Sequence, residues 1–412
     1  MSMERRVLII AYHYPPLAGA GVLKILRTSR YLNKYGWKPL VLTVKNPEPY
    51  HRADNPIPDS VSVFRSWRIP GGNLLARILR RLKLDERWLL LPDQYLFWIP
   101  GTVLYGYYLM LRHRVDLIYV TAPPYSALIC GAFLKLLTGK PLISDIRDPW
   151  SFNGARRGYP SRFHGWIDRR WEEWVLRCSD YITCIYRITK AGYYQRYEWT
   201  RGKISVFYDT VDLADLPDAV EPYSKFTLTY LGTFYPPFTA LLAVLQAIQG
   251  LLNRSEIVAE RFCFNYVGPH DKQFDELVRR FGLEAVVRRS GYQPMKEAQR
   301  EAFKSQMLLL LLEFPTINTK LFDYLASGNP ILAVVPEFSE LEELLDAYAS
   351  RYAKVTDGDE QKIAESIKQC YNDHYQGKLH LNSEKVEKFR SRLNIEHETR
   401  QLAEIFDKVI MP

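Results

Sequence analysis

The fold is decided by one stretch of the sequence, Asn318-Thr319-Lys320-Leu321-Phe322-Asp323-Tyr324-Leu325-Ala326-Ser327-Gly328-Asn329-Pro330-Ile331-Leu332. An apolar run, 307–312, precedes it, and a second apolar run, 330–335, begins within it. Such uninterrupted runs are typical of buried strands, and a glycine commonly follows the last turn of a helix. The stretch therefore predicts a buried strand, a turn, a short helix stopped by Gly328 and a second buried strand.

Two charged residues share one face of this predicted helix. Lys320 and Asp323 are three residues apart, so they lie on the same side of it. Doubly wound sheets bind ligands where their parallel strands end, and this helix follows such an end. A phosphate would suit Lys320 and the helix N-terminus at Asn318–Thr319, and a sugar diol would suit Asp323. The alternative is a surface salt bridge on an ordinary crossover helix.

A second candidate loop lies near the N-terminus. Arg6-Val7-Leu8-Ile9-Ile10-Ala11 predicts a buried strand, and Tyr14-Pro15-Pro16-Leu17-Ala18-Gly19-Ala20-Gly21 leads from it into a helix. Glycines at 19 and 21 let the backbone approach a ligand and leave amide groups pointing at it. The loop is not the dinucleotide fingerprint, because it lacks the third glycine and its two prolines lengthen it. A plain strand–helix turn remains the alternative.

Strand and helix patterns alternate along the whole chain, which predicts two doubly wound α/β domains joined near 209–224. Strands are expected at 6–11, 38–44, 61–66, 116–121, 141–145, 180–184, 203–207, 226–232, 262–267, 286–290, 307–312, 330–335 and 352–355. Helices are expected near 20–35, 101–113, 124–138, 164–178, 187–198, 238–253, 271–281, 294–304, 318–327, 339–348, 359–374 and 395–410.

Length and composition agree with two globular domains. A chain of 412 residues exceeds what one core usually supports. The five cysteines form no CxxC pair and the eight histidines no pair at metal-ligand spacing, so we expect reduced thiols and no metal site. No signal peptide and no apolar stretch of about eighteen residues is apparent, which favours a cytoplasmic protein. The net charge of +9 is dispersed and accompanies no nucleic-acid motif, so we expect no nucleic-acid partner.

Carboxylates and a histidine follow two further predicted strands. Asp145, Arg147 and Asp148 lie at the end of the strand 141–145, where Asp145 or Asp148 could orient an acceptor hydroxyl and Arg147 could contact a phosphate. The residues do not rank the two aspartates, and a buried Arg–Asp pair that shapes the loop is the alternative. His13 follows the first strand and either faces the ligand or is hydrogen-bonded within its loop.

Taken together, these segments resemble the retaining GT-B glycosyltransferases of group one, the family-four type. That family combines an N-terminal Pro-Pro-x-x-Gly-x-Gly loop with a C-domain helix of the Lys-x-x-Glu-Tyr-Leu-Ala-x-Gly-x-Pro type. Further matches are Asp145-Ile146-Arg147-Asp148-Pro149-Trp150, Val206-Phe207-Tyr208-Asp209-Thr210-Val211-Asp212, Tyr230-Leu231-Gly232-Thr233-Phe234 and Gly291-Tyr292-Gln293-Pro294. The resemblance covers essentially the whole chain.

The resemblance implies two Rossmann-like domains that face a central cleft. An acceptor domain would comprise 1–210 and a nucleotide-sugar domain 211–390, and a C-terminal helix in 391–412 would pack back on the first domain. It implies a metal-independent enzyme without a resident cofactor, which moves a sugar from a nucleoside diphosphate sugar to an acceptor hydroxyl with retention. The implied catalytic residues are Asp145, Arg147, Asp148 and His13. The implied donor-binding residues are Gly19, Ala20, Gly21, Gly232, Thr233, Gly268, Gln293, Asn318, Thr319, Lys320 and Asp323.

The sequence departs from the family pattern in two places. The first glutamate of the Glu-x7-Glu motif is replaced by Pro315, and the nearest carboxylate is Glu313. The second acidic position is Asp323, which can still accept two hydrogen bonds from a diol. The loop 233–239 offers no arginine or lysine, so Lys320 and Arg147 would have to neutralise the diphosphate. These departures leave two alternatives open, a sugar-nucleotide 2-epimerase of the same fold and a non-catalytic, membrane-peripheral relative.

The segment 73–100 combines basic and apolar residues. Arg77, Arg80, Arg81 and Lys83 alternate with leucines in an expected amphipathic helix, and 88–100 adds tryptophan, tyrosine and phenylalanine. Such a pattern is typical of a protein that lies on an anionic membrane surface. The acceptor would then be a lipid-linked sugar, used at the inner face of the membrane in surface polysaccharide or glycolipid assembly. The alternative is that these residues pack onto the domain or line a pocket for a small-molecule acceptor.

Overall fold

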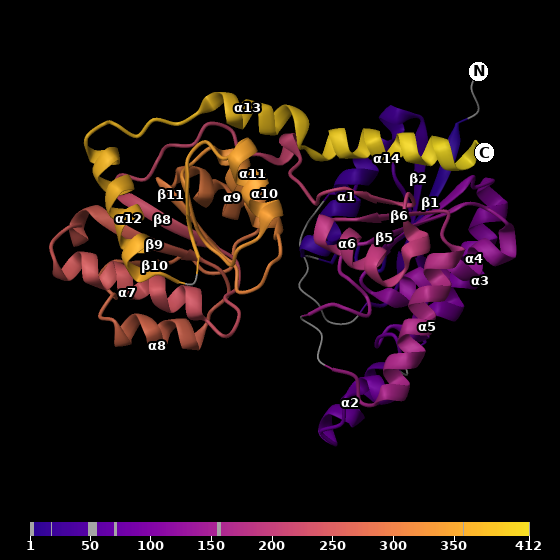
Figure 1. Cartoon of the computed structure of the whole chain (residues 1–412). Helices are drawn as coiled ribbons and strands as arrows, with labels where there is room; N and C mark the ends of the chain where they lie inside the picture. Colours follow the sequence, from indigo (N-terminus) through magenta and orange to yellow (C-terminus); the bar gives the residue numbers. More distant parts are fainter. Residues whose placement is uncertain are drawn as a thin grey trace. The chain divides into compact units, whose positions relative to one another are not determined.

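The computed structural model describes residues 4–17, 19–47, 56–69, 72–154, 158–356 and 358–411. The chain divides into two compact units (Figure 1). The N-terminal unit comprises 1–209 and 395–412, and the C-terminal unit comprises 210–394. The division at 209/210 lies beside the expected 210/211, and the return to the first unit begins at 395 where 391 was expected.

The N-terminal unit is built on a parallel sheet of seven strands in the order β3-β2-β1-β4-β5-β6-β7. Its strands are nearly continuous runs of apolar residues, because a parallel sheet with helices on both faces is buried on both faces. They are β1 (Arg5–Ile10), β2 (Trp37–Val44), β3 (Ser62–Ser66), β4 (Leu117–Ala122), β5 (Leu142–Ile146), β6 (Tyr181–Cys184) and β7 (Ile204–Val206).

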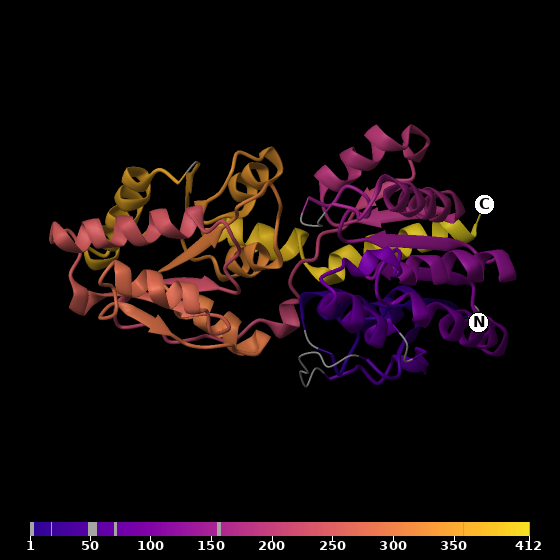
Figure 2. The ribbon, with the colours of Figure 1, turned by 90° about the horizontal axis from the view of Figure 1, so that it is seen from below.

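Helices cover the two faces of this sheet (Figure 2). Core residues of α1 and the C-terminal helix α14 pack on one face, and those of α3, α4, α5 and α6 pack on the other. The helices are α1 (Ala20–Leu32), α2 (Gly72–Arg81), α3 (Ile99–His113), α4 (Tyr125–Thr138), α5 (Arg162–Cys178), α6 (Arg187–Arg196) and α14 (Ile395–Ile410). Short 3-10 turns are η1 (Asn33–Tyr35), η2 (Glu86–Trp88), η3 (Leu96–Trp98) and η4 (Glu198–Thr200).

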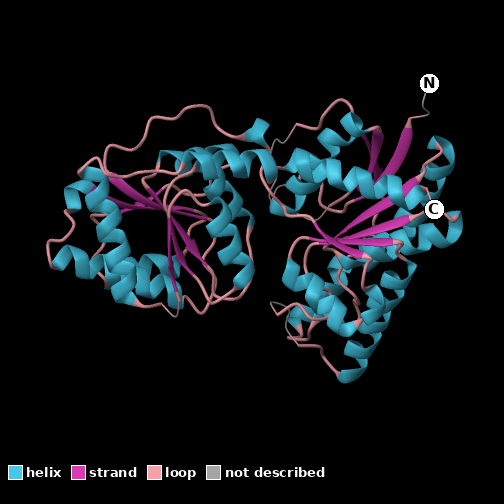
Figure 3. Cartoon of the chain, turned by 45° about the horizontal axis from the view of Figure 1, so that its top comes forward, coloured by secondary structure: helices cyan, strands magenta, loops and turns pink. Residues whose placement is uncertain are grey.

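The C-terminal unit repeats the plan with six parallel strands in the order β10-β9-β8-β11-β12-β13 (Figure 3). The strands are β8 (Phe226–Leu231), β9 (Phe262–Val267), β10 (Val287–Arg289), β11 (Met307–Leu311), β12 (Ile331–Val334) and β13 (Tyr352–Val355). The helices are α7 (Thr239–Asn253), α8 (Lys272–Arg280), α9 (Met295–Lys304), α10 (Thr319–Ser327), α11 (Ser339–Tyr348), α12 (Glu360–Tyr375) and α13 (Ser383–Arg392), with 3-10 turns η5 (Leu213–Asp215) and η6 (Ala259–Arg261). The prediction of two doubly wound parallel sheets is confirmed, and the predicted strands all occur within one residue at each end.

Helix α13 was not expected from the sequence. Most of its residues are polar or charged, so its apolar periodicity is too weak to reveal it. In the structure Phe389 is fully buried, with its ring 5.8 Å from that of Tyr348, and Arg390 donates to the Ala326 carbonyl at 2.7 Å. Tertiary packing on α10 and α11 therefore stabilises this helix.

The strand orders define where each sheet can bind a ligand. Chain direction across the sheet reverses between β1 and β4 in one unit and between β8 and β11 in the other. The carboxyl ends of these strands form the switch points at which doubly wound folds bind ligands. The glycine loop 19–21 follows β1, and α10 follows β11.

Candidate functional site

The Lys320 ammonium lies over the end of β8 in the C-terminal unit. Its Nζ is 4.0 Å from the centroid of the Tyr230 ring, and a Cβ on Gly232 would lie 3.3 Å from it. Gly232 has φ of 104°, a left-handed conformation that glycine adopts without strain. The lysine side chain therefore faces bare backbone at the switch point.

A second glycine completes this surface. A Cβ on Gly268, directly after β9, would collide with the Gly232 carbonyl oxygen and lie 2.6 Å from the Tyr266 ring. Tyr230 donates to the Thr233 carbonyl and Tyr266 to the Pro269 carbonyl, both at 2.8 Å, so each strand's tyrosine fixes the loop that follows it. The backbones of Gly232 and Gly268 are therefore in close contact, and next to Lys320 they present backbone atoms without side chains.

Burial controls the charge of Lys320. Desolvation lowers the pKa of this lysine to about 7, and in the described part of the chain no carboxylate forms an ion pair with it. Asp323 is instead buried and accepts from Gln299 Nε2 at 2.8 Å. The alternative of a surface salt bridge between Lys320 and Asp323 is therefore wrong. A bound anion would supply the negative counter-charge that is missing here and would favour the protonated form of Lys320.

The N-terminus of α10 adds unsatisfied groups. Asn318 precedes the helix with extended backbone, and its side chain makes no capping hydrogen bond. Its Oδ1 is buried and has no hydrogen-bond partner among the residues that the structure describes. The first amides of a helix, here those of Thr319 and Lys320, have no intrahelical acceptor and favour an anion, whereas the Leu321 amide donates to the Asn318 carbonyl at 3.1 Å.

Other predicted donor residues lie in loops of the same unit. Thr233 is exposed after β8, whereas Gln293 is partly buried and donates to the Ser290 carbonyl at 2.7 Å. Among the described residues, Gln293 and Lys320 share no hydrogen bond. Glu313 accepts from the Ala240 amide at 3.3 Å, so it caps the first turn of α7.

In the N-terminal unit, Arg147 is the residue that holds the switch point together. Its Nε donates to Ala122 O at 3.3 Å and its Nη2 to Pro123 O at 3.1 Å, at the end of β4. A Cβ on Gly21 would lie 2.8 Å from Arg147 Nη1. The guanidinium therefore fits against the glycine loop, of which Gly19 has φ of 111° and Ala20 begins α1.

His13 lies in the electrostatic field of Arg147. Burial, and then the charge of Arg147, lower the pKa of His13 to about 4. The imidazole is therefore neutral at neutral pH and can accept a proton or a hydrogen bond. Its ring lies 5.2 Å from that of Tyr12 and 6.2 Å from that of Tyr95.

The two aspartates occupy different environments. Asp145 is fully buried and accepts from Lys24 at 2.9 Å, Thr183 at 2.7 Å and Thr121 at 2.8 Å. Asp148 is only partly buried, and desolvation raises the pKa of its carboxyl although Arg147 opposes the shift. Asp145 is committed to interior partners, whereas Asp148 is the carboxylate that an incoming molecule can reach.

Several buried charged residues were missed by sequence reasoning. Asp168 accepts from Trp150 Nε1 at 3.0 Å and from the Tyr159 hydroxyl at 2.7 Å, and Glu172 accepts from the Ser151 amide at 3.1 Å. These α5 carboxylates hold the loop that follows Asp148. Their spacing with Val175 and Leu176 places them on the apolar side of α5, a periodicity that could have revealed them. Nothing in the sequence near Lys24 indicates its pairing with Asp145.

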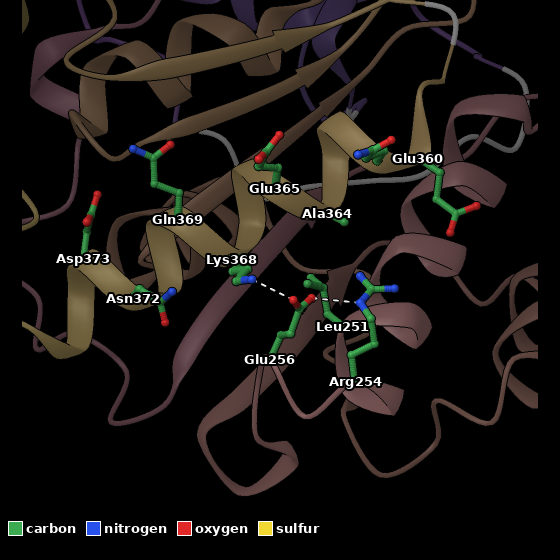
Figure 4. A pocket seen from close by; sticks show the side chains of 11 residues that line it. Leu251, Arg254, Glu256, Glu360, Ala364, Glu365, Lys368, Gln369, Asn372 and Asp373 are labelled. Carbon is green, nitrogen blue, oxygen red and sulfur yellow. Dashed lines mark hydrogen bonds and ion pairs between the residues drawn. The ribbon is translucent and has the colours of Figure 1, made fainter.

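A pocket elsewhere in the C-terminal unit lies between α12 and the end of α7 (Figure 4). Charged residues line it, and Glu256 pairs with Lys368 at 2.6 Å and Arg254 at 3.0 Å. The end of α7 lies at the sheet edge opposite the carboxyl ends of the strands, because the helix runs back from β8. The pocket is therefore separate from the Lys320 region.

Neither a cluster of possible metal ligands nor a membrane-spanning helix is present among the described residues. No three His, Cys, Asp or Glu side chains there converge on a common point as metal ligands do. Among the described residues, no helix is long and apolar enough to cross a membrane.

Residues 19–208 match the family of the glycosyl transferase 4-like domain. Over the full chain, the fold is similar to sucrose-phosphate synthase from Thermosynechococcus elongatus, with a TM-score of 0.71, 13% identity and coverage of 98% of both chains. HepE from Anabaena in complex with UDP gives 0.62 and 14%, covering 98% of this chain and 100% of that one. Trehalose-6-phosphate from E. coli bound with UDP-2-fluoro glucose gives 0.66 and 12%, covering 99% of each. No curated protein sequence matches.

The chain thus combines the GT-B fold with a glycosyl transferase 4-like domain in its N-terminal half. The GT-B fold expected from the sequence is confirmed, and the match to a glycosyl transferase 4-like domain over residues 19–208 agrees with the resemblance.

Proposed function

We propose that this protein transfers a sugar from a nucleoside diphosphate sugar to an acceptor hydroxyl. The observation that carries the proposal is the Lys320 ammonium, which has no carboxylate partner in the described residues and lies beside Gly232 at the carboxyl end of β8. A diphosphate would restore the full charge of this lysine and occupy the free amides of α10. The glycosyl transferase 4-like domain supports the same activity from the other unit.

The donor is assigned to the C-terminal unit. Two of the structurally similar proteins are named with UDP or UDP-2-fluoro glucose, which makes uridine diphosphate the first nucleotide to test. In this proposal Lys320 and the α10 amides bind the diphosphate. Gly232 and Gly268, which lack side chains, let the diphosphate approach the backbone. Asp323, oriented by Gln299, accepts hydrogen bonds from the ribose diol. Thr233 and Gln293 would contact the donor from their loops.

The N-terminal unit would bind the acceptor. Asp148 is the better candidate to orient the acceptor hydroxyl, because Asp145 already accepts three internal hydrogen bonds. His13 is neutral at neutral pH and would accept a hydrogen bond from the sugar, while Arg147 would hold the loop 19–21, whose amides can donate to a negatively charged group. Preorganised donors of this kind stabilise a departing diphosphate more than they stabilise the bound substrate.

The finer features of the activity rest on the resemblance. We propose retention of the anomeric configuration, no metal requirement, and a lipid-linked or small-molecule acceptor on the cytoplasmic side in surface polysaccharide or glycolipid assembly.

The test is to incubate the full-length protein with a panel of nucleotide sugars, with and without lipid extract. Release of nucleoside diphosphate together with a glycosylated product supports the transferase, and analysis of that product's anomeric configuration tests retention. An isomerised nucleotide sugar would instead identify an epimerase. Binding without turnover of any donor would identify a non-catalytic protein.

A further inference from the structure

The basic and apolar segment 73–100 divides into two parts in the structure. Leu90 and Trp98 are buried, and the Trp98 ring meets that of Tyr12 edge-on at 5.1 Å, so the second part packs onto the N-terminal unit. The first part is different. Its large apolar side chains from Ile78 onward are mostly exposed, namely Ile78, Leu82, Leu84, Trp88 and Leu89.

The first turns of α5 expose aromatic side chains as well. Phe163 is 64% and Trp166 51% exposed, and their rings stack with centroids 6.1 Å apart. Arg170 lies 5.6 Å from the Trp166 ring and also pairs with Glu173 at 3.2 Å. Nothing in the sequence pattern linked these residues to 73–100.

Direct contacts join the two segments into one surface. The His164 ring lies 4.8 Å from that of Trp88, and His164 Nε2 is 3.3 Å from the Trp88 carbonyl. Arg87 donates to the Gly158 carbonyl at 2.7 Å, and its guanidinium lies 5.6 Å from the Tyr159 ring. Figure 1 shows α2 beside the start of α5 at one end of the N-terminal unit. We call this surface, formed by 77–89 and 162–170, the tip.

The tip is also basic. Arg77, Arg81 and Lys83 are exposed on one segment, and Arg162 and Arg169 are exposed on the other. Exposed tryptophan and phenylalanine on the same segments as exposed basic residues are typical of a surface that inserts side chains among anionic lipid headgroups. Contiguous exposed apolar area of this kind is unfavourable in water and marks a site of interaction with a partner or a membrane.

The position of the tip agrees with a membrane-borne substrate. Helix α5 starts after the loop that follows β5, so the tip lies toward the sheet edge that carries Arg147 and Asp148. A second exposed apolar patch, with Leu104 and Leu111 of α3, lies toward the opposite edge, because α3 leads into the amino end of β4. Of these two patches, the tip is the one nearer the carboxyl ends of the strands.

We propose that the tip docks the protein on an anionic lipid bilayer, with Phe163 and Trp166 inserted and the five basic residues against the headgroups. The docking proposal extends the proposed function. It depends on that function only for the idea that the acceptor is borne by a lipid. Binding to vesicles needs no turnover, so the docking surface and the transferase activity can fail separately.

The experiment is co-sedimentation of the full-length protein with vesicles of phosphatidylcholine, with and without phosphatidylglycerol. The triple variant Arg77→Gln/Arg81→Gln/Lys83→Gln should bind anionic vesicles on the order of 100-fold more weakly, from about fivefold for each charge. The matched control Lys272→Gln/Arg279→Gln/Arg280→Gln removes three exposed charges from α8 and should bind as the native protein does. High salt should release the native protein.

A second pair of variants tests insertion. Phe163→Ser/Trp166→Ser should bind at least about tenfold more weakly, because two aromatic side chains no longer leave water. Leu104→Ser/Leu111→Ser removes comparably exposed apolar groups from α3 and should bind normally. All four variants change exposed residues, so equal melting temperatures are expected.

Three outcomes would overturn the proposal. They are the absence of native binding to anionic vesicles, equal losses in the tip and control variants, and lipid-independent dimerisation that the tip variants abolish. The last outcome would assign the tip to a second copy of this chain.

Discussion

Lys24 Nζ lies 2.9 Å from Asp145 Oδ1, and the two side chains are 4% and 0% exposed. Burial alone would raise the pKa of Asp145, but Lys24 and the hydroxyls of Thr183 and Thr121 bring it below its ordinary value. Burial raises the pKa of the Glu398 carboxyl in α14 to about 8, and the charge of Lys24 opposes this rise. One lysine thus compensates carboxylates from β5 and from the C-terminal helix.

Lys24→Met should strongly destabilise the protein, because it leaves Asp145 charged and unpaired in the interior. The expected loss is about 3–5 kcal/mol in the free energy of unfolding, measured by urea denaturation. The matched control is Lys34→Met, which removes an exposed lysine that pairs with Glu396 and should leave the free energy of unfolding nearly unchanged. Similar losses in both variants would show that the buried pair has no special weight.

Lys320→Ala should weaken binding of uridine diphosphate by about 1.5–3 kcal/mol, the range for a hydrogen bond to a charged group. Uridine itself should bind unchanged, because it lacks the phosphates. Calorimetric titration with both ligands provides the measurement, and Lys296→Ala, an exposed lysine of α9, is the control. An equal loss for uridine and uridine diphosphate would contradict the assignment of Lys320 to the diphosphate.

The affinity for uridine diphosphate should fall as the pH rises above about 7. The free Lys320 loses its proton near that pH, and the ligand requires the charged form, so binding above pH 7 should take up a proton. Calorimetry in buffers of different ionisation enthalpy measures this uptake. Lys320→Arg keeps its charge and should abolish the pH dependence. A pH-independent affinity in the native protein would contradict the prediction.

Lys320 should also make the free energy of unfolding depend on pH, but this quantity should rise with pH whereas the affinity for uridine diphosphate should fall. Its pKa is about 7 in the folded protein and 10.5 ordinarily, so between these values the unfolded chain binds more protons. The free energy of unfolding of the ligand-free protein should therefore gain a contribution that rises with pH across this window, and Lys320→Ala should remove it.

Gly21→Ala should reduce activity while leaving the fold intact. The added Cβ would lie 2.8 Å from Arg147 Nη1 and displace the guanidinium from the Ala122 and Pro123 carbonyls. Since alanine favours the helix by about 1 kcal/mol, the melting temperature should not fall. A loss of roughly 10- to 100-fold in kcat/KM is expected. Gly154→Ala, whose new Cβ would have no atom of the described residues within 4 Å, is the control and should retain full activity.

Turnover should persist in excess chelator, because lysine, arginine and backbone amides are proposed to stabilise the leaving diphosphate. The measurement is nucleoside diphosphate release before and after dialysis against EDTA. Activity that disappears and returns with magnesium or manganese would show that the proposed mechanism is wrong.

Some features of the fold could be predicted because they depend on short-range patterns. The apolar runs 307–312 and 330–335 are typical of strands buried on both faces and pair in the sheet as such strands, and Gly328, with φ of 76°, ends the helix between them as expected. Helix α13 escaped prediction because only a few of its side chains are apolar, and its stability comes from the surface it covers.

The sequence by itself determined the two series of alternating strands and helices, the glycines at the strand ends and the type of residue available there, because backbone geometry and periodicity are local. Only the tertiary structure decided which side chains keep their charge and which remain accessible. Asp145 and Asp148 are equivalent candidates in sequence, but Lys24, 121 residues away, engages the first and leaves the second within reach. The pKa of Lys320 likewise depends on desolvation by Tyr230 and its neighbours, and burial is a property of the assembled fold.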